Sequence, residues 1–394
     1  MSGNEIIDNQ ELRELKNIFT KSKGVLFAHG FDLRRNNIFR TKIFEKNFRK
    51  YLKCKYAVSC SSGTAAGTIA LMALGIGKGD EVIVQSFTFI AAIESILMTG
   101  AKPVIVDTDN TLGMCPKDLQ KKITKKTKCI MPVHMLGGIA NMSKILSIAK
   151  KKRIPIIEDA CEALGAEYFG KQVGTMGLSG FFSLDFGKII TTGEGGIICT
   201  NDRKQYLNLK SLRDHGHINK PGIHRGLDKA LRRGFNFRMT EMQGAVGLAQ
   251  LKKINKILDL KRKNRKIIYD ILNKNKSIKF RTIHDKSSKG DQNDHIIFFL
   301  KNPKIAKKVK KELDKKKIST GILPVAIRWH YAGYWKHIWK EDKKFRNYLK
   351  IDYWKNAWSL LQRSISIPVS ILAKKEKLKA DSHKISKIIN NHNL

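Results

Sequence analysis

The sequence predicts an α/β fold, with a large domain built on a mostly parallel sheet covered by helices and a smaller C-terminal α+β domain. Two observations support this. Short apolar runs alternate with helical segments from about residue 55 to 200, which is typical of a parallel sheet with helices on both faces. The chain also has 394 residues, 42% of them hydrophobic, enough for two domains.

The predicted strands of the large domain are apolar runs of four to five residues, at 56–59, 81–85, 103–106, 129–133, 154–157 and 197–200. One predicted helix begins at Gly63, and three more lie near 89–99, 116–123 and 142–151. Ligands of such sheets bind at the carboxyl ends of the strands. We therefore expect the functional site at that edge.

A long helix is expected from Thr240, a good N-cap residue, to about Leu272. It would join a large domain at residues 1–250, with a helical segment at 1–50, to a small domain at 251–394. In the small domain we expect strands at 295–300 and 366–369 and helices at 303–315 and 373–389, with Trp335 and Trp339 packed inside it. The polar loop at 217–233 is long enough to be functional or mobile.

The formal net charge is +42, from 76 Lys and Arg against 34 Asp and Glu. These lysines are spread along the chain, which favours a solvated surface over a nucleic-acid-binding patch; the alternative predicts steeply salt-dependent DNA binding. The six cysteines lack metal-ligand spacing, so we expect reduced thiols and no metal site. No apolar run reaches the roughly 20 residues needed to span a bilayer, and we expect a cytoplasmic protein without membrane contact.

Three motifs point to chemistry, and the first is the run from Ser61 to Ala66, which follows a strand and opens a helix. The free N–H groups and the dipole at a helix start attract anions, and Gly63 permits close backbone approach. An ordinary capped helix is the alternative.

The second motif is the apolar strand that ends in Glu158-Asp159. Neighbouring side chains on a strand point to opposite faces, so only one of these acids can face a given site. A carboxylate at that end of a strand can hold a protonated ring nitrogen. The competing interpretation is that Asp159 caps a following helix.

The third motif places Lys188 in an apolar, glycine-rich turn between Phe182 and Gly196. Apolar surroundings lower the pKa of a lysine and make it nucleophilic. In so lysine-rich a chain, a plain surface lysine remains the alternative.

Taken together, these motifs closely resemble those of the DegT/DnrJ/StrS family of sugar aminotransferases, pyridoxal-phosphate (PLP) enzymes with the fold-type I architecture. The resemblance extends from about Phe44 to Ile388. The stretches that carry it are residues 62–66, 79–83, 88–89, 132–134, 158–163, 182–183, 188, 192–196 and 234–239.

The resemblance implies a role for each matching residue. Lys188 would carry PLP as a Schiff base and act as nucleophile and general acid/base, and Asp159 would pair with the ring nitrogen of the cofactor. The remaining cofactor-binding residues would be Gly63, Thr64, Ala65 and Ser183 around the phosphate, Phe89 stacked on the ring, and Asn236, which would reach the phosphate in a neighbouring subunit. A homodimer with shared active sites follows.

One position departs from the commoner family pattern, because Glu162 stands where many relatives have Gln near the ring hydroxyl of the cofactor. A carboxylate there would have to be protonated or to move. The residues expected on the substrate side are His215, Arg225, Arg328 and His330. His134 also has a matching position, although a lone histidine is more often structural.

The resemblance thus implies amino transfer from an amino acid, with L-glutamate as the expected donor, to a keto-sugar, most simply a nucleotide-linked one, in surface-polysaccharide or amino-sugar biosynthesis. An eight-carbon acidic keto-sugar is an alternative acceptor. Related sugar dehydratases replace the Schiff-base lysine with histidine, so Lys188 argues against dehydration. An amino-acid lyase and a non-catalytic regulatory relative remain as further alternatives.

Overall fold

The computed structural model describes residues 3–218, 227–228, 233–323 and 325–392. Its strands are β1 (Tyr56–Cys60), β2 (Glu81–Gln85), β3 (Lys102–Val106), β4 (Thr127–Ile130), β5 (Ile157–Asp159), β6 (Glu167–Tyr168), β7 (Lys171–Gln172), β8 (Ser179–Ser183), β9 (Gly196–Thr200), β10 (Lys279–Phe280), β11 (His295–Phe299) and β12 (Ser364–Pro368). Its α-helices are α1 (Asn9–Lys21), α2 (Arg40–Tyr51), α3 (Gly63–Ala73), α4 (Ile90–Leu97), α5 (Pro116–Lys122), α6 (Met142–Lys152), α7 (Arg203–Leu212), α8 (Glu241–Leu272), α9 (Pro303–Lys315), α10 (Lys336–Trp339), α11 (Lys355–Gln362) and α12 (Lys375–His392).

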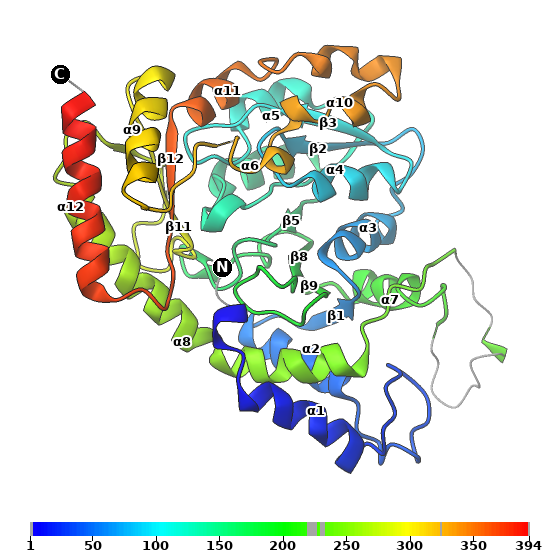
Figure 1. Ribbon diagram of the computed structural model, residues 1–394. Coiled ribbons are helices and arrows are strands. Elements are labelled where there is room, and N and C mark those ends of the chain that lie inside the picture. The colour runs from blue at the N-terminus through cyan, green and yellow to red at the C-terminus, as the bar shows by residue number, and fades with distance from the viewer. Residues whose placement is uncertain (1–2, 219–226, 229–232, 324, 393–394) are drawn as a thin grey trace.

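The central sheet confirms the predicted α/β class (Figure 1). Strands β3, β2 and β4 pair in parallel, as do β5 and β8. Two parallel bridges, Ile130 with Ile156 and Val133 with Asp159, connect these groups. Strand β9 is antiparallel to both β8 and β1. The strand order is therefore β3-β2-β4-β5-β8-β9-β1, and the carboxyl ends of all these strands except β9 share one edge.

Three features of this sheet differ from the sequence prediction. Strand β4 spans Thr127–Ile130, not 129–133. Strand β8 was not predicted, because its residues were interpreted only as part of the lysine motif. Strand β5 begins at Ile157, not at Ile154. Pro155 has no N–H to donate to a ladder, and regular pairing starts two residues after it.

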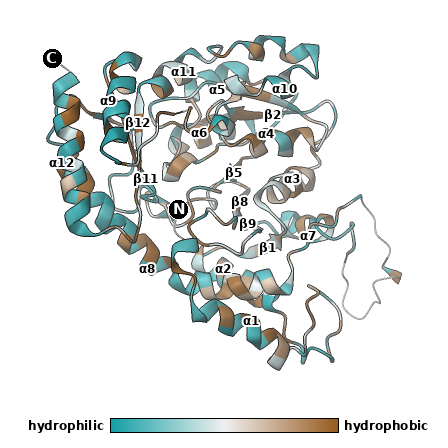
Figure 2. Cartoon of the chain, in the orientation of Figure 1, coloured by the Kyte–Doolittle hydropathy of each residue, from teal (hydrophilic) through white to brown (hydrophobic). Residues whose placement is uncertain are grey.

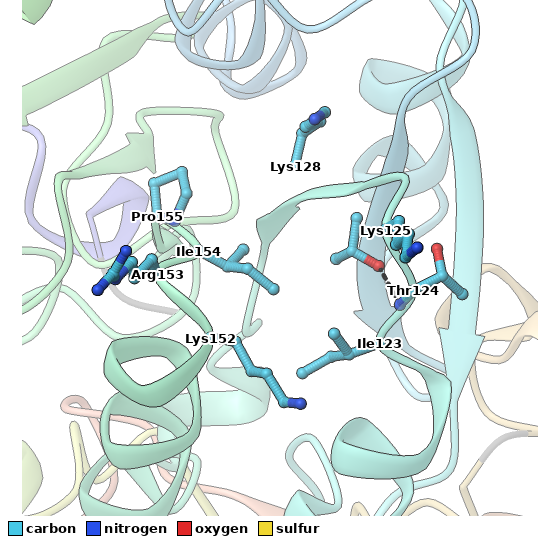
Figure 3. A pocket seen from close by; sticks show the side chains of 9 residues that line it. Ile123, Thr124, Lys125, Lys128, Lys152, Arg153, Ile154 and Pro155 are labelled. Carbon is cyan, nitrogen blue, oxygen red and sulfur yellow. Dashed lines mark hydrogen bonds between the residues drawn. The ribbon is translucent and has the colours of Figure 1, made fainter.

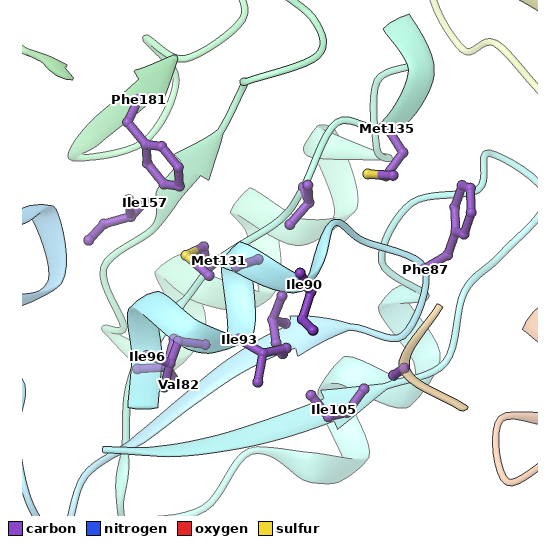
Figure 4. Close-up of a cluster of buried hydrophobic side chains, with 14 of the residues drawn as sticks. Val82, Phe87, Ile90, Ile93, Ile96, Ile105, Met131, Met135, Ile157 and Phe181 are labelled. Atoms are coloured by element: carbon purple, nitrogen blue, oxygen red, sulfur yellow. The ribbon is translucent and has the colours of Figure 1, made fainter. Parts of the chain in front are cut away.

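Alternation along the strands gives the sheet two hydrophobic faces. On β2, Val82 and Val84 belong to one buried cluster and Ile83 to the other. Helices α3, α4 and α7 cover the first face, and Figure 4 shows Ile93 and Ile96 of α4 close to Val82. Helices α2, α5, α6 and α8 cover the second. The sheet is thus buried on both sides, as its apolar strands predict.

A third buried cluster unites the C-terminal half of α8 with β11, β12, α9 and α12. Figure 2 shows hydrophilic residues along much of α9 and α12, which bound this cluster on the outside. The segment at 328–362 contributes to the first cluster instead. Trp335 and Trp339 pack there against each other and against Phe345 and Tyr348. Trp354 Nε1 donates to the carbonyl of Ile105 on β3.

Helix α8 begins as predicted, with Thr240 as its N-cap in a capping box with Gln243. Among the described helices, none is both long and apolar enough to cross a bilayer.

Glu241, the first residue of α8, is buried and binds residues of the N-terminal segment. It pairs with Arg35 at 2.7 Å and accepts from Thr41 Oγ1 at 2.6 Å.

We expect Glu241→Ala to lower the free energy of unfolding by about 3–5 kcal/mol, because it leaves the buried guanidinium of Arg35 without its carboxylate. Chemical denaturation measures this change. The matched control on the same helix is Asp270→Ala, which removes an exposed pair with Lys266 and should cost less than about 1 kcal/mol. Equal losses in the two variants would contradict the assignment.

Candidate active site

Lys188 lies in the turn that follows β8, at the carboxyl edge of the sheet. Its N–H donates to the carbonyl of Asp185 at 3.0 Å, and Thr192 N–H closes the loop on the carbonyl of Leu184 at 2.9 Å. The Lys188 side chain is only 14% exposed. The turn therefore directs the amine into the molecule, so Lys188 is not one of the solvated surface lysines.

Carboxylates, not apolar groups, dominate the surroundings of this amine. Lys188 Nζ lies 3.5 Å from Glu162 Oε1. Burial alone would lower the pKa of Lys188, but Glu162, with Asp159 and Asp185, outweighs burial and raises that pKa. The expected lowering of the pKa is therefore wrong for these surroundings, because the sequence motif did not reveal which carboxylates surround the amine.

Glu162 is the centre of this charge cluster. Its Oε2 accepts from the backbone N–H of Leu136 at 2.9 Å, and its Oε1 lies 3.9 Å from Nε2 of His330. Burial opposes ionisation of Glu162, yet Lys188, His330 and the Leu136 N–H together lower its pKa. In these surroundings Glu162 is an ionised partner of Lys188, not a protonated acid.

The two acids at the end of β5 face different environments, as strand alternation predicts. Glu158 is fully buried; its Oε1 accepts from the N–H groups of Met176 at 2.6 Å and Gly177 at 2.7 Å, and its Oε2 from Gly174 at 2.9 Å. Asp159 faces the Lys188 side. Burial raises the pKa of Asp159, although the Cys161 N–H donates to its Oδ1.

His134 belongs to the Glu158 side of the strand. Its ring is completely buried, Nδ1 accepts from the Ala140 N–H at 3.3 Å, and Nε2 lies 3.4 Å from Glu158 Oε2. Both ring nitrogens therefore have protein partners. This histidine holds the loop after β4 in place and is not placed to contact a substrate.

The start of α3 supplies the anion site. Ser62 is the N-cap, and its Oγ accepts from the Ala65 N–H at 3.1 Å. The next residues, Gly63 and Thr64, present first-turn N–H groups, which have no helical partner. A Cβ on Gly63 would lie 2.9 Å from the Ser183 side chain. Glycine is thus required for the helix start to approach the end of β8, where Ser183 and Lys188 lie.

Phe89 and His330 form an aromatic pair next to Glu162. Their ring centroids are 5.8 Å apart and nearly perpendicular, and the Thr88 N–H donates to the His330 carbonyl at 3.0 Å. Burial lowers the pKa of His330 despite the nearby Glu162. Within the described part of the chain, the buried Nδ1 of His330 has no hydrogen-bond partner. This atom can accept or donate to a bound polar group.

The site therefore suits a flat, phosphorylated, cationic ring. It combines a helix N-terminus for the phosphate, a carboxylate for a ring nitrogen, an amine for a carbonyl carbon, and an aromatic wall. The sequence-predicted residues that the structure brings together here are Gly63, Thr64, Ala65, Phe89, Asp159, Glu162, Ser183, Lys188 and His330.

Of the other predicted residues, three lie outside this cluster in the described chain, and the fourth is not described. His215 and Asn236 are exposed. Asn236 forms an antiparallel bridge with Asp214, the residue before His215. Arg328 is exposed too, with its guanidinium 5.6 Å from the ring centroid of Tyr334. Arg225 lies outside the described residues, so the structure does not place it.

Two groups of the site, the Leu136 N–H and the Cys161 thiol, were not predicted from the sequence. The Leu136 N–H binds Glu162, but a backbone donor leaves no side-chain signature in a sequence. Cys161 lies between Asp159 and Glu162, and a Cβ on Gly63 would lie 3.3 Å from its sulfur. Burial and the neighbouring Asp159 raise the pKa of the Cys161 thiol. The thiol is therefore a neutral packing group beside the charges.

A cavity of about 600 Å³ lies away from this site, at the amino ends of β4 and β5 (Figure 3). Its lining residues include Lys125, Lys128, Lys152 and Arg153. All four cationic side chains are exposed, so the cavity has no buried charged group and is typical of the lysine-rich surface.

Comparison with known proteins identifies the family of this chain. The DegT/DnrJ/EryC1/StrS aminotransferase family matches residues 37–385. The chain belongs to this family. The resemblance inferred from the motifs is thereby confirmed.

Two curated relatives are GDP-perosamine synthases. That of Caulobacter vibrioides is 45% identical over 221 residues, covering 55% of this chain and 57% of the relative. That of Escherichia coli O157:H7 is 42% identical over 233 residues, covering 59% and 62%. The matched region thus spans less than two thirds of either relative.

Among solved structures, the aminotransferase from Psychrobacter cryohalolentis superposes with a TM-score of 0.84. The match covers 99% of this chain and 98% of that one, at 24% sequence identity. This likeness confirms the predicted fold.

The different roles of the β5 acids lead to opposite effects on stability. Glu158→Gln should lower the free energy of unfolding by about 1–3 kcal/mol, because an amide NH₂ would face backbone donors. Asp159→Asn should leave stability at pH 7 unchanged or higher: its folded-state pKa is raised, so ionisation of Asp159 above that pKa opposes folding. Denaturation of the cofactor-free variants measures both effects. A larger loss for Asp159→Asn would contradict this division.

Glu162→Gln should lower the pKa of Lys188, because it removes the carboxylate that counteracts burial. The pH dependence of Lys188 acetylation in the cofactor-free protein, followed by mass spectrometry, reports this pKa. Glu194→Gln, an exposed glutamate near the same loop, is the control and should leave the pKa unchanged. An unchanged titration in Glu162→Gln would show that other groups determine the charge of Lys188.

Proposed function

We propose that this protein is a PLP-dependent aminotransferase that moves an amino group from an amino acid, with L-glutamate as the expected donor, to a nucleotide-linked keto-sugar. The observation that carries the proposal is the amine of Lys188, buried beside Glu162 and Asp159. The start of α3 packs against Ser183, five residues before this lysine. Membership of the aminotransferase family supports it.

PLP, when bound, supplies an electron sink for the carbon that loses its proton. Asp159 Oδ would hold the proton on the ring nitrogen of the cofactor. The first-turn N–H groups at Gly63 and Thr64, with the Ser183 hydroxyl, would bind its phosphate. Phe89 would cover one face of the ring, which also excludes water.

Lys188 Nζ is the group placed to move protons. Nearby carboxylates raise its pKa, so the resting amine is protonated and must lose a proton before it can attack a carbonyl carbon. The Nδ1 atom of the neutral His330 ring has no hydrogen-bond partner among the described residues. It can therefore accept a proton or bind a polar group of the substrate. Glu162 stabilises whichever of these two groups carries the charge.

The acceptor follows from the named relatives. Because they are GDP-perosamine synthases, we propose a GDP-linked keto-sugar as the first acceptor to test. Lys188 itself supports amino transfer over dehydration, because the related dehydratases have histidine there. We also propose a homodimer, in which the exposed Asn236 of one subunit serves the site of the other; light scattering in solution tests the dimer.

The decisive experiment adds L-glutamate to the PLP-loaded protein and measures release of 2-oxoglutarate. The protein should release up to one equivalent per site without acceptor, and turn over when a GDP-linked keto-sugar is added. Turnover only with an eight-carbon acidic keto-sugar would correct the acceptor. No keto acid with any amino donor would sink the aminotransferase proposal.

Lys188→Ala should lose both the visible absorbance of lysine-bound PLP and at least about 10³-fold of the activity, because it removes the nucleophile and the proton carrier. Lys171→Ala, an exposed lysine on β7, is the matched control and should keep both. A Lys188→Ala protein that retains the absorbance band would place the cofactor on another lysine.

A further inference from the structure

The segment before α1 runs against the turn that carries Lys188. Figure 1 shows this blue segment beside α8. The N–H of Gly3 donates to the carbonyl of Lys188 itself at 3.0 Å. A residue near the N-terminus thus binds the main chain of the reactive lysine directly.

Gly3 is buried, and the space around it is too small for any side chain. A Cβ there would lie 2.8 Å from the backbone nitrogen of Thr191 and 2.9 Å from Cα of Ile190. Both are backbone atoms of the loop that contains Lys188, so they cannot yield without moving that loop. The close approach explains why glycine occupies this position.

The rest of the segment is held by α8. Lys253 Nζ donates to the carbonyl of Ile6 at 2.8 Å and pairs with Glu11 at 2.8 Å. Gln250 of α8 binds both α1 and the lysine loop, since its Nε2 donates to Glu11 and its Oε1 accepts from the Thr191 N–H. Helix α8 therefore fixes both the segment and the lysine loop.

A third attachment reaches the C-terminal sheet. Glu5 Oε2 accepts from Ser370 Oγ and from the Ile371 N–H, each at 3.3 Å. Ser370 follows β12, and its carbonyl accepts from Asn264 of α8 at 2.9 Å. Residues 3–6 thus connect the lysine turn, the long helix and the C-terminal sheet.

We propose that residues 3–6 form an N-terminal strap that positions Lys188 through its main chain, with Gly3 as the positioning residue. The role in catalysis rests on the proposed aminotransferase function, because the strap holds the turn that aims the amine at Glu162 and Asp159. Catalysis is sensitive to displacements of about 1 Å in such groups.

Two variants test the strap. Gly3→Ala adds a single carbon that must displace the Ile190–Thr191 backbone, and a protein that lacks residues 1–6 removes the strap but keeps the capping box of α1 between Asp8 and Glu11. Gly77→Ala is the matched control, because the nearest atom to a Cβ there is 3.7 Å away.

The first readout is hydrogen exchange of the peptide at 186–192 in the cofactor-free protein, which does not depend on activity. Exchange should be about tenfold faster in both strap variants and unchanged in Gly77→Ala, because the turn loses a hydrogen bond and its close packing. In the loaded enzyme, kcat should fall roughly tenfold or more with little change in the KM of the keto-sugar.

Unchanged exchange at 186–192 in both strap variants would overturn the proposal, and so would a fall limited to KM. If one variant fails to fold, the other decides the outcome. A wild-type protein that releases no 2-oxoglutarate would refute the proposed function alone, since the exchange experiment would still show whether the strap orders the Lys188 turn.

Discussion

The alternation of side chains at the end of β5 is the constraint on which the site depends. Because Glu158 and Asp159 are adjacent on a strand, they must point to opposite faces. Glu158 is bound by three backbone N–H groups at 174–177 and lies beside His134. That arrangement fixes the strand between its neighbours. Asp159 is consequently held at the carboxyl edge, where burial keeps its pKa raised.

The same edge is joined to the C-terminal part of the chain by a second buried charge. Arg281, next to β10, donates to the carbonyl of Met135 at 3.0 Å and pairs with Asp291 at 2.7 Å. Leu136, the following residue, has a left-handed backbone conformation and gives its N–H to Glu162. The loop after β4 therefore contacts both Arg281, beside the C-terminal sheet, and Glu162, the carboxylate that pairs with Lys188.

Much of this arrangement could be predicted from sequence, because it depends on local patterns. Helix α8, with its Thr240 cap, and the buried strands such as β2 follow from periodicity and capping. Gly63 and Asp159 follow from their places at a helix start and a strand end, and Lys188 follows from its apolar, glycine-rich turn. Strand β8 was missed because its apolar residues were interpreted as the surroundings of a lysine. That Trp335 also shares a buried cluster with the strands of the large domain was not predicted, because packing between distant segments leaves no periodic signal.

The pKa of Lys188 illustrates the limit of such reasoning most clearly. Its immediate sequence neighbours, Gly187 and Ile189, are glycine and apolar, which by itself predicts a depressed pKa. Tertiary structure instead brings Glu162 to 3.5 Å from the amine, with Asp159 close by, and these negative charges outweigh the cost of burial. In a chain with 76 Lys and Arg, a buried lysine is distinguished less by its own turn than by the carboxylates that other strands bring to it. Asp159 is the last residue of β5, and Glu162 lies three residues after it. Strand β5 therefore positions both carboxylates that raise the pKa of Lys188.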